Sequence, residues 1–135
     1  MKKFLWVPLA FISISAVAEV AVVVHPSNAV ALNSEAIAQI YLGRSKSFPD
    51  GKTVLPLGQL ESSKVTEQFN QKVLNKSGSQ IKAYWSKLVF TGKGTPPKEF
   101  SSDAEVLELV SQNPSVIGYV DKAVVNDTVK VLATF

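Results

Sequence analysis

The chain has 135 residues, of which 46% are hydrophobic and 19% charged, and it contains no cysteine. The 14 basic residues only slightly exceed the 11 acidic ones and form no stripe interleaved with aromatic residues, so we expect no nucleic-acid partner. The absence of cysteine from the sequence excludes disulfides and a lipid-modified cysteine.

The N-terminal segment has the pattern of an export signal peptide. Lys2 and Lys3 supply positive charge, residues 4–15 form an apolar run, and Ala16-Val17-Ala18 matches a cleavage site built from small residues. The apolar run is shorter than the roughly 20 residues that a membrane-spanning helix needs. The segment therefore predicts export to the periplasm.

This interpretation divides the chain into a signal peptide, residues 1–18, and one domain, residues 19–135. The domain is not expected to span a membrane once the signal is removed. An uncleaved anchor is the alternative, because residues 20–24 extend the hydrophobic stretch, although Pro8 and Glu19 interrupt it.

The first third of the domain predicts a strand, a helix and a second strand. Residues 20–24 are mostly β-branched and predict a buried strand, and residues 25–28 have turn chemistry. Ser34 is a favourable N-cap and precedes apolar residues at helical spacing, which predicts a helix that Ser34 caps and that ends at Gly43. A polar loop then leads to a strand at residues 53–57.

Three further helices are expected in the middle of the chain. The first covers residues 62–74, and Ser79 is expected to cap the second. After a Gly/Pro loop at residues 92–97, Ser102 is expected to cap the third, with Glu105 completing a capping box. The second helix carries apolar residues that predict a broad buried face: Ile81, Tyr84, Trp85, Leu88 and Val89.

Two strands, residues 116–120 and 128–133, close the chain. Strands that alternate with helices predict an α/β domain. We expect a mostly parallel sheet of four or five strands with helices on both faces.

No catalytic or metal-binding pattern emerges from the sequence. His25 is the single histidine, there is no cysteine, and no serine lies in a nucleophile-elbow motif. Gly92-Lys93-Gly94 lacks the spacing of a phosphate-binding P-loop. We therefore expect neither enzyme activity, nor a cofactor, nor a metal site.

Several of these features occur in an order that resembles the second lobe of the phosphate-type periplasmic binding proteins of bacterial ABC transporters. They are the helix at residues 37–43 (IAQIYLG), the turn at 48–51, the strand at 54–57, the helix starting at Ser62-Ser63, the helix with Trp85, the loop at 92–94, and Ile117-Gly118-Tyr119-Val120. The resemblance covers nearly all of residues 20–131. It implies one lobe of the type II periplasmic-binding-protein kind, whereas those proteins hold their ligand between two lobes.

The resemblance also implies an oxyanion site at the start of a helix. The family has an arginine at a strand end and then Ser-Gly-Thr, whose backbone N–H groups bind the anion at the positive end of the helix dipole. In this chain Gln59 occupies the position of the family's arginine, and Ser63 matches the family's serine. Lys64 replaces the glycine and Val65 replaces the threonine. Ser62, Ser63, Lys64 and Gln59 are thus candidate anion-binding residues, with Lys64 as a replacement point charge.

His25 and Ser27 are further candidates, because they follow the first strand at a position where α/β domains often bind ligands. An ordinary surface turn is the alternative for both residues.

Two functions remain open from the sequence. The first is an exported solute-binding-like module with weak affinity for an oxyanion such as phosphate, whose site is completed by a homodimer or by an envelope protein. The second is a protein-interaction module of the cell envelope that has kept the lobe but lost the ligand.

Overall fold

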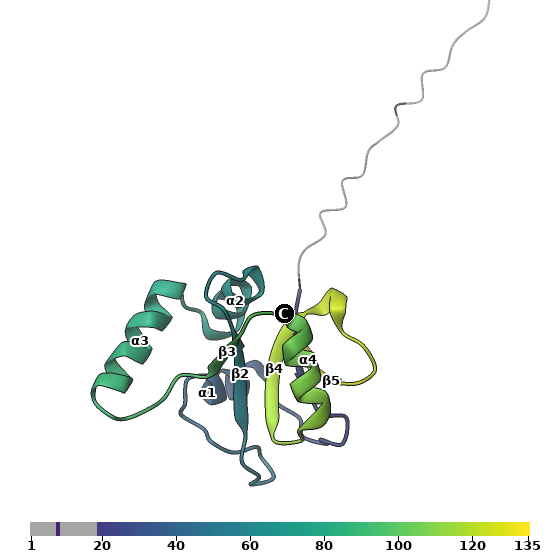
Figure 1. The fold of residues 1–135 in the computed structure, drawn as a ribbon, viewed down its shortest axis with the longest axis horizontal. Helices are drawn as coiled ribbons and strands as arrows, with labels where there is room; N and C mark the ends of the chain where they lie inside the picture. The colour runs from purple at the N-terminus through teal and green to yellow at the C-terminus, as the bar shows by residue number, and fades with distance from the viewer. Residues whose placement is uncertain (1–7, 9–18) are drawn as a thin grey trace, which may run out of the picture.

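The structure, a computed structural model, describes Pro8 and residues 19–135, so the predicted signal peptide otherwise lies outside the described residues (Figure 1). The elements follow one another as β1 (Val20–Val24), α1 (Ser34–Tyr41), β2 (Leu55–Gln59), α2 (Lys64–Phe69), the π-helix η1 (Asn70–Leu74), α3 (Gly78–Phe90), β3 (Lys98–Phe100), α4 (Asp103–Gln112), β4 (Val116–Asp121), the 3₁₀-helix η2 (Lys122–Val124) and β5 (Lys130–Thr134).

The five strands form one sheet in the order β3-β2-β4-β1-β5. Strand β2 is parallel to β3 and β4, while β1 is antiparallel to β4 and β5. Strand β5 therefore runs in the same direction as β4, and four of the five strands point one way. This confirms the predicted mostly parallel α/β sheet, with β1 as its antiparallel member.

Strand β1 is buried on both faces and divides the core in two. Its side chains alternate across the sheet. Val20, Val22 and Val24 pack with residues of α1, α2 and η1, whereas Ala21 and Val23 pack with residues of α4. Helices thus cover both faces of the sheet, as predicted.

The helix starts follow capping chemistry, with two corrections to the expected residues. Asn33, rather than Ser34, caps α1 by accepting from the N–H of Ala36 at 2.8 Å. Ser77, rather than Ser79, caps α3 and forms a reciprocal capping box with Gln80. A capping oxygen must lie just before the first turn to reach its free N–H groups, which both earlier residues do.

Helix α3 is the largest departure from the expected packing. It stands beside the sheet in Figure 1, and Trp85 is its buried residue. Val89 is 54% exposed and Phe90 92% exposed. The predicted broad buried face is therefore only partly formed. Ile81 and Tyr84 are half-buried and pack against the core, whereas the exposed Val89 borders an open groove.

Two contacts anchor α3 to the rest of the domain. The Tyr84 hydroxyl donates to the carbonyl of Leu42 at 2.6 Å. The Trp85 ring lies against Gly43, where a Cβ atom would approach it to 3.0 Å. The chain then returns through Pro96-Pro97 to β3, a strand that the sequence did not predict, on the outer edge of β2.

Candidate functional site

The predicted anion site lies where β2, β3 and β4 end and α2 and α4 begin. Gln59, the last residue of β2, is 4% exposed. Its side-chain Nε2 donates to Asp103 Oδ1 at 2.7 Å and to the carbonyl of Tyr119 at 2.9 Å. Both amide hydrogens are thus engaged within the domain, and Gln59 joins β2, α4 and β4 instead of pointing its donors at a ligand.

The chain's own groups occupy the start of α4. The Asp103 carboxylate accepts from Gln59 and, at 3.4 Å, from the backbone N–H of Asp121. Ser102 caps the same helix, as predicted, by accepting from the N–H of Glu105 at 3.2 Å. A carboxylate in the first turn suits the positive end of the helix dipole, so this helix start already holds a negative charge.

The start of α2 differs from those of the other described α-helices. Ser63 is its N-cap, with extended backbone, yet the Ser63 side chain makes no capping hydrogen bond within the described residues. The N–H of Ser63 itself donates to the carbonyl of Leu60 at 2.9 Å. The amides that follow Ser63 belong to the first helical turn, which lacks intrahelical acceptors. Ser62 and Lys64 flank this turn and are exposed.

His25 and Ser27 lie near the start of β4, at the opposite end of the parallel strands from Gln59. Their side chains contact each other, with His25 Nδ1 2.7 Å from Ser27 Oγ. The next residue, Asn28, donates to the carbonyl of Pro114, just before β4 begins, at 3.5 Å. Because β1 is antiparallel to β4, its end meets the start of β4, and the structure does not bring these two residues to the predicted site.

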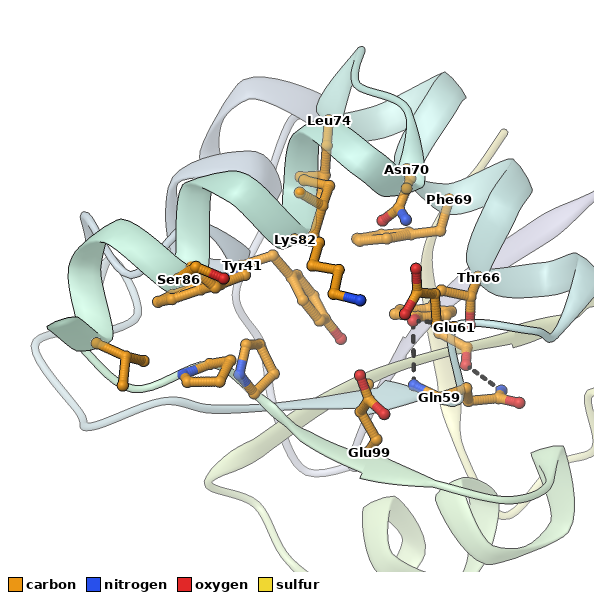
Figure 2. Close-up of a pocket in the computed structure, with 18 of the residues that line it drawn as sticks. Tyr41, Gln59, Glu61, Thr66, Phe69, Asn70, Leu74, Lys82, Ser86 and Glu99 are labelled. Carbon is orange, nitrogen blue, oxygen red and sulfur yellow. Dashed lines mark hydrogen bonds between the residues drawn. The ribbon is translucent and has the colours of Figure 1, made fainter.

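A cavity of about 570 Å³ lies between α3 and the ends of β2 and β3 (Figure 2). The apolar part of its lining comes from the body of the domain and from α3 and the loop after it: Tyr41, Phe69, Leu74, Ile81, Trp85, Val89, Phe90, Pro96, Pro97 and Tyr119. The sequence did not predict this cavity, because the same apolar residues would equally fit a closed core.

An aromatic cluster forms the floor of the cavity. The rings of Phe69 and Tyr119 stack with centroids 4.1 Å apart, and Tyr41 meets Phe69 edge-on at 4.6 Å. The Tyr41 hydroxyl donates to the carbonyl of Leu57 at 2.9 Å. Burial raises the pKa of Tyr41 well above its usual value, and the neighbouring Tyr119 raises it further. Tyr41 is therefore a neutral structural donor.

Tyr119 links the floor to the predicted anion site. Its hydroxyl donates to Thr66 Oγ1 at 3.3 Å and accepts from the backbone N–H of Gln59 at 3.1 Å. Burial raises the pKa of Tyr119, the negative charge of Glu99 adds to this effect, and the hydrogen bonds with Thr66 and Gln59 oppose it. This hydroxyl also stays protonated at neutral pH.

The described part of the chain contains neither a metal-binding group of side chains nor a membrane-spanning helix. No group of three or more side chains there has the composition needed to hold a metal ion. Similarly, none of the helices in residues 19–135 combines the length and apolar character needed to cross a membrane.

Comparisons with known proteins address the fold. No protein-family model matches the sequence, and no curated protein matches it either. Among solved structures, an ABC-type phosphate transport receptor from Vibrio cholerae is 18% identical and matches 85% of this chain with a TM-score of 0.66. A putative phosphate ABC transporter substrate-binding protein from Clostridium perfringens, with bound phosphate, is 20% identical over 85% of this chain with a TM-score of 0.66.

PstS from Borrelia burgdorferi is similar as well, at 16% identity over 86% of this chain with a TM-score of 0.63. The chain has the fold of part of these receptors. It spans 46%, 44% and 47% of their respective chains, which is less than half of each. The fold predicted from the resemblance, one lobe of such a protein, is confirmed. By their names, the Vibrio cholerae protein is a transport receptor and the Clostridium perfringens protein is a putative substrate-binding protein.

Proposed function

We propose that this chain is an exported, non-enzymatic solute-binding lobe that holds an oxyanion such as phosphate at the start of α2. The observation that carries the proposal is the N-cap Ser63, whose side chain makes no capping bond within the described residues, whereas the caps of α1, α3 and α4 do. The fold likeness to proteins named for phosphate transport supports the choice of ligand.

Weak affinity is expected for this site. The Ser63 hydroxyl, the amides of the first turn and the exposed ammonium of Lys64 favour an anion. Gln59, however, brings no charge and is engaged elsewhere, and the carboxylate of Glu61 lies next in the chain to Ser62. A second lobe, from another copy or from an envelope protein, would be needed to enclose the ligand.

The anion site is tested by calorimetry with phosphate, sulfate and arsenate at millimolar concentration. The informative variant is Ser63→Asp, because aspartate is also a favourable N-cap and should keep α2 folded while repelling the anion. We expect binding heat from the unmodified protein and none from Ser63→Asp. The matched control is Ser27→Asp at the opposite end of the parallel strands, which should leave the heat unchanged.

Two results would count against the anion site. One is the absence of heat from the unmodified protein at millimolar anion. The other is equal loss of heat in Ser63→Asp and Ser27→Asp, which would indicate a general effect of charge.

The mass of the protein recovered from producing cells tests whether it is exported and cleaved. We expect the protein recovered from the periplasm of a producing cell to begin at Glu19, the residue after the predicted cleavage site. A mass that includes residues 1–18 would favour the anchor interpretation.

A second candidate function is a protein-interaction module of the envelope, and α3 favours it. Phe90 is 92% exposed and Val89 is 54% exposed at the end of this helix. Neighbouring large apolar side chains in contact with water are typical of a surface that binds a partner. The closed Gln59–Asp103 contact at 2.7 Å fits a lobe that no longer binds an anion there.

Native mass spectrometry of the exported protein tests this second function. The interaction module predicts a dimer or a stoichiometric envelope partner, which Phe90→Ser should dissociate. Val124→Ser, a matched change at another exposed apolar residue, should not. A protein that is monomeric, without a partner, and that gives heat with anions would support the first function over the second.

A further inference from the structure

The cavity beneath α3 contains a buried polar side chain whose hydrogen-bonding capacity is unused. Asn70 is 6% exposed and lines the cavity, and its side-chain amide bonds to no other described residue. No fully buried side-chain nitrogen or oxygen in the described chain lacks a partner, so the Asn70 amide must meet the open space. Figure 2 shows it directed into the cavity, above the ring of Phe69.

The backbone around Asn70 is unusual for a helix. Asn70 is the first residue of the π-helix η1, and its carbonyl accepts from Lys76 at 3.0 Å. The helix ends at Asn75, which has a left-handed φ of 53°. π-Helical turns occur often at functional sites, where they redirect a side chain. The turn therefore presents a buried amide to a cavity that is otherwise mainly apolar.

Charged groups surround the polar end of the same cavity. The carboxylates of Glu61 and Glu99 and the ammonium of Lys82 line it, and in Figure 2 all three side chains reach toward one open space. None of the three forms an ion pair with another described residue within 4.0 Å. Glu61 also approaches the start of α3, with Oε1 3.8 Å from the position of a Cβ on Gly78. The polar end thus carries one net negative charge.

The other end of the cavity is apolar. Its walls there include Trp85, Val89 and Phe90 of α3 and Pro96 and Pro97 of the loop that follows. Its volume of about 570 Å³ falls within the range of small-molecule sites, which is roughly 300–1,000 Å³. Mainly apolar walls with a few convergent polar groups are the usual composition of such sites.

We propose that this cavity binds a small organic amine with an apolar body. The ammonium lies between Glu61 and Glu99 and donates to the side-chain carbonyl of Asn70, while the apolar body lies along Trp85 and Pro96. Charge-assisted hydrogen bonds to two carboxylates favour a cation over an anion of the same shape. This inference does not rest on the oxyanion proposal, which concerns the turn at Ser63.

The probes are three molecules with one apolar body and different head groups: octylammonium, 1-octanol and octanoate. Trp85 lines the cavity and reports binding through its fluorescence once Trp6→Phe makes it the sole tryptophan of the full chain. We expect saturable binding of octylammonium, at least about tenfold tighter than that of octanoate. Calorimetry with the same three probes provides the second readout.

Exposed rim residues allow variants that keep the fold. Glu61→Gln and Glu99→Gln should each weaken octylammonium binding roughly twofold to fivefold, and the double variant by about tenfold. Lys82→Gln should tighten it by a similar twofold to fivefold factor, because it removes a competing positive charge. The matched control is Glu108→Gln, an exposed carboxylate on α4 at the other face of the sheet, which should change nothing.

Three outcomes would overturn the proposal. The first is that octanoate or 1-octanol binds as tightly as octylammonium. The others are weaker octylammonium binding in Lys82→Gln and no saturable signal from any probe. Loss of phosphate heat in Ser63→Asp without any effect on octylammonium would show that the two sites are independent.

Discussion

Gly118 lies in the middle of β4, directly beneath α4. A Cβ atom added there would lie 2.5 Å from Cγ1 of Val106 and 3.3 Å from Cγ2 of Val110. Both valines are fully buried, so neither can move aside into solvent. The helix approaches the sheet closely because this one strand position has no side chain.

Gly118→Ala should therefore overpack the interface between α4 and β4. We expect it to lower the free energy of unfolding by about 1–3 kcal/mol, measured by urea denaturation. The matched control is Gly78→Ala, where the new Cβ finds its nearest neighbour at 3.8 Å in the first turn of α3. That variant should be equal to the parent or more stable by about 0.5 kcal/mol. A neutral Gly118→Ala would mean that α4 can shift outward.

Some residue roles could be predicted from the sequence and others could not. Ser102 was predicted as a cap because its partner, Glu105, lies only three residues away. The role of Gln59 was not predictable, because its partners Asp103 and Tyr119 are 44 and 60 residues away. The buried position of Asn70 beside the cavity was not predictable either, because an asparagine within a helical pattern is usually a surface residue.

At the scale of elements, α3 is held by few contacts and should behave as a separate unit. Trp85→Ala removes its buried anchor against Gly43 and Gly94. We expect hydrogen exchange in α3 to lose about 2–4 kcal/mol of protection while β1 and β4 keep theirs, because the sheet core does not depend on this helix.

Val89→Ala serves as the control for this experiment. Val89 is 54% exposed, and its truncation should change protection by at most about 0.5 kcal/mol. An equal loss of protection in α3 and in the central strands after Trp85→Ala would show that α3 folds cooperatively with the sheet.

The elements also show what a local pattern can and cannot specify. Strands β1, β4 and β5 were predicted because each has a run of β-branched or apolar residues. Strand β3 was missed because it has three residues, two of them charged, directly after Pro96-Pro97. An apolar helical face indicates that α3 covers something, but only the folded chain shows that it covers a groove. The direction of β1, which separates His25 from Gln59, is likewise a property of the whole sheet.

For the molecule as a whole, two buried hydroxyls connect stability to alkaline pH. Burial raises the pKa of both Tyr41 and Tyr119 in the folded state. Below about pH 10, the usual tyrosine pKa, both are protonated in the folded and unfolded chains, and their contribution is complete. Above it the unfolded chain releases protons that the folded chain retains, so stability falls as pH rises.

We expect the free energy of unfolding to fall by up to about 1.4 kcal/mol per pH unit for each of these tyrosines above pH 10. Denaturation midpoints across that range measure the slope. Tyr119→Phe removes one titrating group and should flatten the slope, although it lowers stability at every pH because the N–H of Gln59 loses its acceptor. A slope unchanged in Tyr119→Phe would assign the effect to other groups.

Strand β1 is the first described element of the chain, yet both of its neighbours come from the last fifth of the sequence. Val20 pairs with Asp121, and Ala21 pairs with Thr134. A polypeptide emerging from the ribosome therefore cannot complete its sheet until synthesis is nearly over. Such sequence-distant pairing slows folding. If the chain is exported as proposed, this late pairing of β1 would keep it unfolded, and so able to pass through a translocation channel, until its final strand has been made.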